Sequence, residues 1–417
     1  MELFKRSLIV LSSIAVFLIF TIDCVQAGPK EEEFISEVLG IIEKNYIYPS
    51  DPSSCRYQIE NYLASRGPIE LEGGPSLEGE SVCFDKYSEL LTPWEYKALQ
   101  EEMSGHFGGI GAVIGLGEKG GVKVIEPLEG SPALKSGMKA GDIIVKVRQE
   151  NTSEAINVTD ADQAKKMLRG KKGTKVFVTI ERDGALINLE IVRDDIKVRT
   201  VKYKDLPNNI GYISLSMFNE ESADDLEAVL RTFRKYGPNP KVIIDVRRNP
   251  GGCLGCVLEM LYYFSDKPGD IMVTTKFKNK EEVDTIKNQF GRFIDPGTWQ
   301  PKSPGEFKDY RIVILADRYS ASASEIFVGT MKDWGFMAVG SETYGKGVGQ
   351  TVISLSDGSA LVLTTFEYLV GNSKTAVNKK GVSPNIAVGD TRKSLDDTAT
   401  DKDAQFQKAL EVLIKMN

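Results

Sequence analysis

Histidine and paired metal ligands are scarce in this sequence, and their scarcity limits the chemistry open to it. His106 is the single histidine among 417 residues, and it lies in SGHFGG at the edge of a strand-rich part of the chain. A Ser–His–Asp triad would have to recruit it from a different domain, so we expect His106 to be structural or exposed. Of the five cysteines, Cys253 and Cys256 are closely spaced, but no second Cys or His pair accompanies them to complete a zinc site.

The chain also lacks the charge distribution of a nucleic-acid-binding protein. Its formal net charge is -7 at pH 7, and no stripe of lysine and arginine stands out. Internal repeats and low-complexity tracts are absent. The composition, 41% hydrophobic and 27% charged, is typical of a globular protein, and the length suffices for two or three domains. We therefore expect no nucleic acid as a partner.

One long hydrophobic run is present, at the N-terminus. Two basic residues precede an apolar stretch over residues 8–22, and Val25-Gln26-Ala27 offers small residues at the positions that a signal peptidase reads. We predict that residues 1–27 are a signal peptide, that the protein is exported to the periplasm or another extracytoplasmic compartment, and that no stable membrane span remains. An uncleaved anchor is the alternative, although the run is short for a span.

Four cysteines follow the predicted signal. Cys55 and Cys83 flank a turn-rich segment and could pair in an oxidising compartment, but two free thiols fit the sequence equally well. Cys253 and Cys256 have the spacing of a redox motif within NPGGCLGC. Here we favour small buried residues at a helix start over a dithiol.

The remainder of the chain divides into three parts by pattern. Residues 28–104 carry helical spacing, and Thr92 and Glu95 are in capping-box register before the second helix. Residues 105–195 have the short apolar runs and glycine turns of strands. Over residues 196–417 strands alternate with helices, as in a parallel α/β sheet.

Three expected strands of the α/β part end in unusual loops. Strand 241–246 ends in RRNPGG, strand 311–316 in DRYSASASE, and strand 335–340 in SETYGKGVGQ. Because the carboxyl ends of parallel strands open into one crevice, we expect the three loops to lie together.

Each loop can supply one part of an acyl-transfer site. NPGG offers backbone N–H groups that can stabilise an oxyanion. SASASE places serines at a strand-to-helix turn, although Ser322 and Glu325 also form a capping box that needs no chemistry. Lys346, between two glycines, is either a surface cation or, if burial removes its proton, a general base. A serine nucleophile needs a base, so in a chain with one histidine these loops favour a Ser–Lys pair.

The third loop is a near miss for a phosphate-binding loop. GSETYGKG has the required glycine and lysine, but Gly347 stands where Ser or Thr would bind magnesium. The residues that follow have a strand pattern where the motif requires a helix, so we expect no nucleotide.

Several motifs together resemble a known family. FGGIGAVIG followed by GSPALKSGMKAGDIIVKV resembles a PDZ domain. DVRRNPGG, SASASE and YGKGVGQ, in this order, resemble the carboxyl-terminal processing peptidases, which are tail-specific serine proteases of family S41. FDKYSELLTPWEYKALQEEMSGHFGGIGA resembles the segment by which that family enters its PDZ domain. The resemblance implies an α/β protease core of ClpP/crotonase-like type over residues 196–417, an inserted mostly-β PDZ domain over residues 105–195, and a small N-terminal helical region over residues 28–104.

The resemblance also implies site residues, and it implies no cofactor and no metal. The nucleophile corresponds to Ser322, the base to Lys346, and the residue that orients this base to Gln350. The oxyanion donors would be backbone N–H groups of Gly251 or Gly252 and of Ala323. The loop that receives a substrate's terminal carboxylate would comprise Gly108, Gly109, Ile110 and Gly111.

The implied function is that of a serine endopeptidase that binds the apolar C-terminal tail of a protein or peptide and cleaves near it through an acyl-enzyme. A catalytically inactive PDZ scaffold is one alternative, against which the intact Ser322, Lys346 and Gln350 argue. An acyl-CoA-processing enzyme of crotonase type is another, against which the PDZ motifs and the signal argue. A homo-oligomer, and inhibition or activation by the PDZ domain, are left open.

The sequence departs from the family pattern away from the catalytic positions. Arg248 stands where the family often has Asn, and Asn385 where Asp is common. The segment from Asp266 to Tyr310 is long for the usual connection. A lid, a dimer contact and a surface loop are all open interpretations of it.

Overall fold

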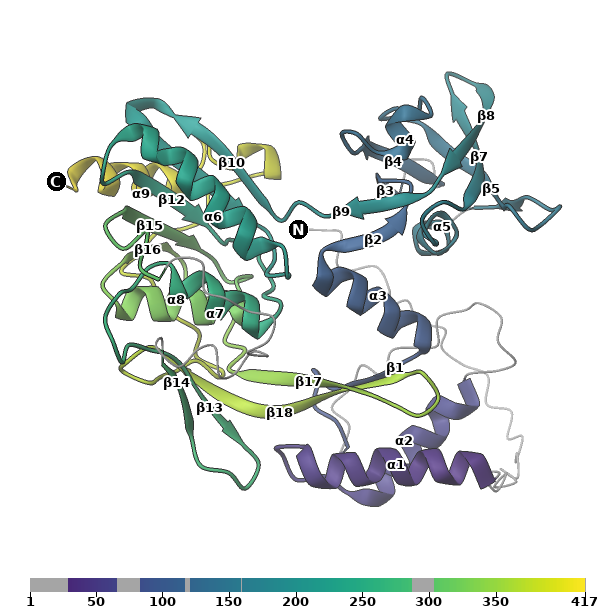
Figure 1. Cartoon of the computed structure of the whole chain (residues 1–417), viewed down its shortest axis with the longest axis horizontal. Coiled ribbons are helices and arrows are strands. Elements are labelled where there is room, and N and C mark those ends of the chain that lie inside the picture. The colour runs from purple at the N-terminus through teal and green to yellow at the C-terminus, as the bar shows by residue number, and fades with distance from the viewer. Residues whose placement is uncertain (1–28, 66–82, 117–120, 159, 287–303, 417) are drawn as a thin grey trace, which may run out of the picture.

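The computed structural model describes residues 29–65, 83–116, 121–158, 160–286 and 304–416. The predicted signal peptide therefore lies outside the described residues. Within them, no helix has both the length and the apolar character needed to cross a membrane. Figure 1 shows an α/β core, a strand-rich module that stands apart from it, and N-terminal helices beneath a long two-stranded ribbon.

The N-terminal part is helical, as predicted, and it packs against the core. Its elements are α1 (Pro29–Asn45), α2 (Pro52–Ser65), β1 (Glu89–Leu91) and α3 (Pro93–Ser104). The predicted capping box starts α3: the Thr92 side chain accepts from the Glu95 N–H, and the Glu95 carboxylate accepts from the Thr92 N–H at 2.8 Å. Apolar side chains of α1 and α2 share a buried cluster with Leu361 and Leu363 of β18 (Ala360–Val370), to which β1 also pairs.

The strand-rich module is a five-stranded antiparallel path with two short helices. Its strands run in the order β3 (Ala112–Leu116), β4 (Val122–Pro127), β5 (Ile143–Gln149), β7 (Lys175–Arg182) and β8 (Ala185–Val192), with β6 (Ile156–Asn157) paired to β5. The helices are α4 (Pro132–Lys135) and α5 (Ala161–Leu168). A separate pair, β2 (His106–Gly109) with β9 (Asp194–Lys197), closes the entry and exit of the module.

The α/β core has a six-stranded sheet. Its order is β10 (Val201–Leu206), β11 (Ile210–Leu215), β12 (Lys241–Asp245), β15 (Arg311–Ala316), β16 (Met337–Gly340) and β20 (Ile386–Ala387), and every pair after β10–β11 is parallel. Alternate side chains of the central strands enter two clusters. Helices α6 (Ser222–Thr232), α7 (Leu254–Tyr262) and α8 (Ala323–Asp333) complete one cluster, and α9 (Ala404–Lys415) completes the other. Short 3-10 turns lie at Pro207–Asn209, Phe233–Tyr236 and Leu395–Asp397.

A second sheet is built around β18, which pairs with β1, β13 (Ile271–Phe277), β17 (Val348–Ser354) and β19 (Thr375–Ala376), while β14 (Val283–Ile286) pairs with β13. The described part of the long segment from Asp266 to Tyr310 contains the β13–β14 hairpin of this sheet, which the sequence did not predict. The α/β core, the mostly-β module and the N-terminal helices together confirm the expected fold class.

Candidate active site

The three alternating serines that follow β15 have different environments. Ser320 and Ser324 are fully buried, and their hydroxyls donate to the carbonyl oxygens of Val246 (2.8 Å) and Asn249 (2.9 Å). Ser322 is half-buried, and among the described residues its hydroxyl is the one of the three that is not used to pin the loop to a neighbouring carbonyl. The environment thus distinguishes the middle serine, which spacing in the sequence could not do.

Ser322 also has an unusual backbone conformation. It precedes the first residue of α8 with φ 56° and ψ -118°, a region that residues with a side chain rarely adopt. Such a strand-to-helix turn can lift a side chain into a crevice, as nucleophile elbows do. Gly251 makes room for it: a Cβ there would lie 2.8 Å from the Ser322 Cβ.

Lys346 is half-buried, and its Nζ lies 4.8 Å from the centroid of the Tyr87 ring. Burial lowers the pKa of the Lys346 ammonium from its usual 10.5, while the negative charge of Asp85 acts in the opposite direction. The neutral amine that a general base requires is therefore closer to reach than in an exposed lysine.

One buried carboxylate connects the serine loop to the lysine loop. Glu325, in the first turn of α8, is fully buried. Its Oε2 accepts from the N–H groups of Ser322 (2.9 Å) and Lys346 (2.8 Å), and its Oε1 accepts from the Gly345 N–H (2.7 Å) and the Thr343 hydroxyl (2.6 Å). Because the two backbones share one acceptor, they are held in a fixed relation to each other.

Tyr368 of β18 makes a second connection between the same two backbones. Its hydroxyl bonds to the carbonyl oxygens of Ser322 (3.2 Å) and Lys346, and its ring is buried. Glu325 on the N–H side and Tyr368 on the carbonyl side thus bind Ser322 and Lys346 together.

The glycine loop lies against the serine turn, and its backbone N–H groups differ in whether they already have an acceptor. The Gly251 N–H donates to the Asn249 Oδ1 at 2.9 Å, so it is already occupied. For the N–H groups of Gly252 and Ala323 no acceptor is found within the described part of the chain. Of the two glycines that the resemblance implies as oxyanion donors, Gly252 is therefore the one whose N–H is available to a substrate.

The interpretation of Cys253 and Cys256 as unpaired small residues was wrong. They form a disulfide across the start of α7, directly after the two glycines, because Cys253 is the N-cap and Cys256 lies one helical turn later. Cys55 and Cys83, whose pairing the sequence left open, also form a disulfide.

Gln350 is not placed by a bond to the lysine. It follows an irregularity in the β17–β18 pairing, and its Nε2 donates to the Thr364 hydroxyl at 3.0 Å. The role of Gln350 in orienting Lys346 stays a prediction.

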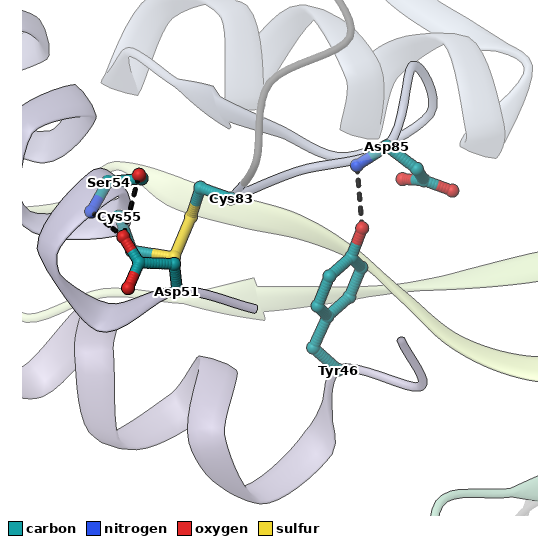
Figure 2. The surroundings of a disulfide bond; sticks show 6 residues. All are labelled: Tyr46, Asp51, Ser54, Cys55, Cys83 and Asp85. Carbon is teal, nitrogen blue, oxygen red and sulfur yellow. Dashed lines mark hydrogen bonds between the residues drawn. A yellow bond between two sulfur atoms is a disulfide. The ribbon is translucent and has the colours of Figure 1, made fainter. Parts of the chain in front are cut away.

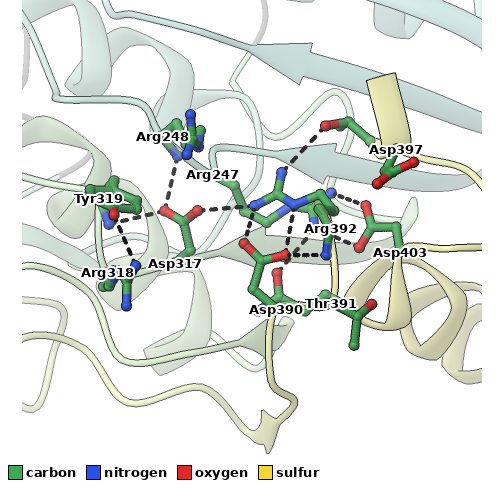
Figure 3. A network of polar contacts seen from close by, with 12 residues as sticks. Arg247, Arg248, Asp317, Arg318, Tyr319, Asp390, Thr391, Arg392, Asp397 and Asp403 are labelled. Carbon is green, nitrogen blue, oxygen red and sulfur yellow. Dashed lines mark hydrogen bonds and ion pairs between the residues drawn. The ribbon is translucent and has the colours of Figure 1, made fainter. Parts of the chain in front are cut away.

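A buried ionic network anchors the loops after β12 and β15 to the C-terminal segment (Figure 3). The Arg247 guanidinium, 1% exposed, bonds to Asp245 and to Asp403, the N-cap of α9. Asp317 accepts from the Arg248 N–H at 2.9 Å and pairs with Arg392 at 3.3 Å. Ion pairs and hydrogen bonds with the C-terminal segment thus fix the loops that follow β12 and β15.

Both departures from the family pattern have local structural partners. Arg248 has φ 61°, and its guanidinium carbon lies 5.3 Å from the centroid of the Tyr319 ring. The Asn385 Oδ1 accepts from the Ala338 N–H at 2.9 Å, next to the β16–β20 pair.

In the strand-rich module, three of the four predicted tail-binding residues line a cavity of about 210 Å³. These are Gly109, Ile110 and Gly111, beside apolar residues and the bases Lys165 and Arg169. Gly108 lies outside this lining, and its carbonyl accepts from the Gly170 N–H. A Cβ on Gly108 would lie 2.2 Å from the Gly170 oxygen, so close backbone approach explains this glycine.

His106 has no part in the crevice. Its Nδ1 lies 3.0 Å from Asp195 and its Nε2 lies 3.6 Å from Glu221, the N-cap of α6, so it joins the strand-rich module to the core. The expectation of a structural or exposed histidine is confirmed.

Sequence reasoning missed Tyr368 and the residues around Asp85. Tyr368 stands in an apolar strand and carries no local signal. Asp85 lies in FDKYS, within a segment that was recognised only by resemblance. Glu325 was predicted as a capping residue, but the sequence gives no sign that the lysine loop also donates hydrogen bonds to it.

Two protein-family models match parts of this chain. The family model "Peptidase family S41" matches residues 209–388, and "PDZ domain" matches residues 108–192. The "Probable CtpA-like serine protease" of Staphylococcus epidermidis is 34% identical over 73% of this chain and 58% of its own length. The protein of the same name from Staphylococcus aureus is 33% identical over 73% of this chain and 57% of its own length. The chain thus spans about three fifths of the length of the curated relatives it matches.

A solved structure of a Bacteroides fragilis protein assigned to the S41 proteases shares the fold. The TM-score is 0.51 at 15% identity, with 91% of this chain and 97% of that chain covered. With the two family models matched in chain order, residues 209–388 form a peptidase domain of family S41, and a PDZ domain over residues 108–192 precedes it.

Proposed function

We propose that this protein is an exported serine endopeptidase that cleaves proteins near their C-terminal tails with Ser322 as nucleophile and Lys346 as general base. The observation that carries the proposal is the shared Glu325 carboxylate, which binds the backbone N–H groups of both residues. The shared acceptor fixes the backbone of the serine relative to that of the lysine, although their loops are more than twenty residues apart.

The proposed reaction proceeds through an acyl-enzyme. Neutral Lys346 takes the proton of the Ser322 hydroxyl as the oxygen attacks a peptide carbonyl. The N–H groups of Gly252 and Ala323 stabilise the oxyanion. Lys346 then gives the proton to the leaving amine, and water, activated by the same lysine, releases the acyl group.

The cavity of the PDZ domain supports tail recognition. Phe107, Ile110 and Leu168 offer it an apolar lining, and Arg169 adds positive charge suited to a terminal carboxylate. A tail bound there would add as a strand to the sheet edge. We therefore expect apolar C-terminal tails to be preferred.

The test compares cleavage of an unfolded protein that carries an apolar tail with a free carboxylate and of the same protein with an amidated tail. Ser322→Ala and Lys346→Met should each abolish cleavage of the free-tailed substrate, while the circular dichroism spectrum stays that of the parent. Ser373→Ala and Lys380→Met, at exposed positions, are the matched controls and should retain activity. Retention of most activity in Lys346→Met would overturn the assignment of the base.

The amidated substrate tests tail recognition separately. Slower cleavage of the amidated tail, with the difference lost in Arg169→Met, supports recognition of the tail carboxylate by the PDZ domain. Equal rates for both tails would refute this recognition and leave the Ser–Lys assignment intact.

A further inference from the structure

A segment from the N-terminal part of the chain lies against the side of Lys346. We name residues 83–88, with the sequence CFDKYS, the N-terminal wall. The Tyr87 ring is the aromatic neighbour of the Lys346 Nζ, at 4.8 Å. The Lys86 Nζ donates to the Tyr344 hydroxyl at 2.9 Å, two residues before Lys346. The wall thus contacts the lysine loop both at the base and beside it.

Asp85 is the polar centre of the wall. Its carboxylate accepts from the Thr364 hydroxyl at 3.0 and 3.1 Å and from the Ser88 hydroxyl at 2.6 Å. Thr364 in turn accepts from the Gln350 Nε2 at 3.0 Å. A continuous hydrogen-bonded chain therefore runs from Asp85 through Thr364 to Gln350, four residues after Lys346.

The wall is fixed at both ends, as Figure 2 shows for its start. Cys83 is tied to Cys55 of α2 by a disulfide, and the Asp85 N–H donates to the Tyr46 hydroxyl at 2.6 Å. At its other end the chain enters β1, which pairs with β18. A segment held in this way presents its side chains in one arrangement.

We propose that the N-terminal wall is part of the active site, and that Asp85 is a positioning residue that sets the placement of Gln350 and the charge state of Lys346 while Tyr87 shields the lysine from water. The inference rests on the proposed function, because it concerns the base of that reaction.

The electrostatic consequence has a definite sign. The groups that act on Lys346 are Asp85 and Lys86 from the wall, Tyr344 from its own loop and Glu325 from α8. Burial lowers the pKa of Lys346, Asp85, Tyr344 and Glu325 raise it, and Lys86 lowers it. Removal of the Asp85 charge therefore favours the neutral amine. Removal of the Tyr87 ring loses the attraction between the ring face and the ammonium. It also admits water to the charged group, and because burial is the largest of the effects on this pKa, the gain in solvation is the larger effect and the ammonium is favoured.

The experiment measures kcat/KM against pH for the full mature chain and for three variants. Asp85→Asn keeps the size of the side chain and one acceptor oxygen. In this variant the acid limb of the pH profile of kcat/KM should move to lower pH by on the order of 1 unit. In Tyr87→Ala the limb should move to higher pH. Asp51→Asn is the control: this carboxylate is exposed, and it accepts from Ser54 at the start of α2, so the limb should not move.

The outcomes separate this inference from the proposed function. Opposite shifts in the two wall variants support the inference, because a purely structural loss would reduce the rate without moving the limb in opposite directions. An unmoved limb in both overturns it, even where Ser322 and Lys346 prove essential. If Asp85→Asn does not fold, Tyr87→Ala decides alone: a shift to higher pH supports the wall, and no shift overturns it. Activity that survives Lys346→Met would instead refute the proposed function.

Discussion

The Glu325 carboxylate should be the acceptor on which both the stability of the core and the geometry of the site depend. Four donors converge on it, three of them backbone N–H groups, and it is fully buried. Burial raises the pKa of this carboxyl, and the hydrogen bonds oppose that rise. Because every partner donates, the ionised carboxylate fits this position better than any neutral group of the same size.

Glu325→Gln replaces one acceptor oxygen with an NH₂ group. Either orientation of the amide leaves two of the four donors facing another donor, although the Thr343 hydroxyl can turn and accept. A buried donor without an acceptor costs about 1–3 kcal/mol, so the variant should lose about 2–4 kcal/mol. This is a substantial part of the roughly 5–15 kcal/mol that stabilises a typical domain.

The assay follows thermal unfolding of the α/β core together with the cleavage rate. Glu325→Gln should lower the melting temperature, and kcat should fall at least about tenfold, because 1.4 kcal/mol of misplacement is enough for that loss. Glu342→Gln is the matched control: this exposed carboxylate accepts from the Ser383 hydroxyl at 3.1 Å, and its loss should leave both quantities nearly unchanged. Wild-type melting and cleavage in Glu325→Gln would refute the role given to this carboxylate.

Three further predictions concern Lys346, Tyr368 and the disulfide between Cys253 and Cys256. Burial holds the folded-state pKa of Lys346 below 10.5, so the unfolded chain binds more protons between the two pKa values and wild-type stability rises with pH across that window. The stabilising effect of Lys346→Met should therefore be larger at pH 7 than at pH 10, as measured by thermal unfolding; an equal effect at both would contradict the burial of its charge. Tyr368→Phe, which removes the hydroxyl bonded to the carbonyl oxygens of Ser322 and Lys346, should reduce kcat more than it changes KM in steady-state kinetics, and the reverse pattern would argue against a positioning role. Cys253→Ser with Cys256→Ser should slow cleavage in steady-state kinetics, and an unchanged rate would show that this disulfide does not support the glycine loop.

The sequence predicted the frame of the site because the relevant signals are local. Strands that end in glycine or serine loops bring their carboxyl ends to one edge of a sheet, and the capping box at Thr92 starts a helix from four neighbouring residues. In both cases the residues that decide the structure are adjacent in the chain.

The remaining parts of the site depend on contacts that no local pattern encodes. Glu325 satisfies a capping pattern with or without the lysine loop, so its connection to Lys346 could not be read from SASASE. The β13–β14 hairpin is set by its pairing with β18, almost a hundred residues later. The disulfide between Cys253 and Cys256 is a matter of side-chain geometry at a helix start, which spacing alone leaves undecided.

The bond between Asp85 and Thr364 joins residues 279 positions apart. The N-terminal wall is synthesised long before Gln350 and β18, so the two halves of the lysine pocket meet only after most of the chain has emerged. Contacts of such high order are slow to form, because the entropy of closing the loop is lost before the contact compensates for it. Under the proposed function, the peptidase site would thereby stay incomplete while its own chain is still unfolded, and the order of synthesis would delay self-cleavage.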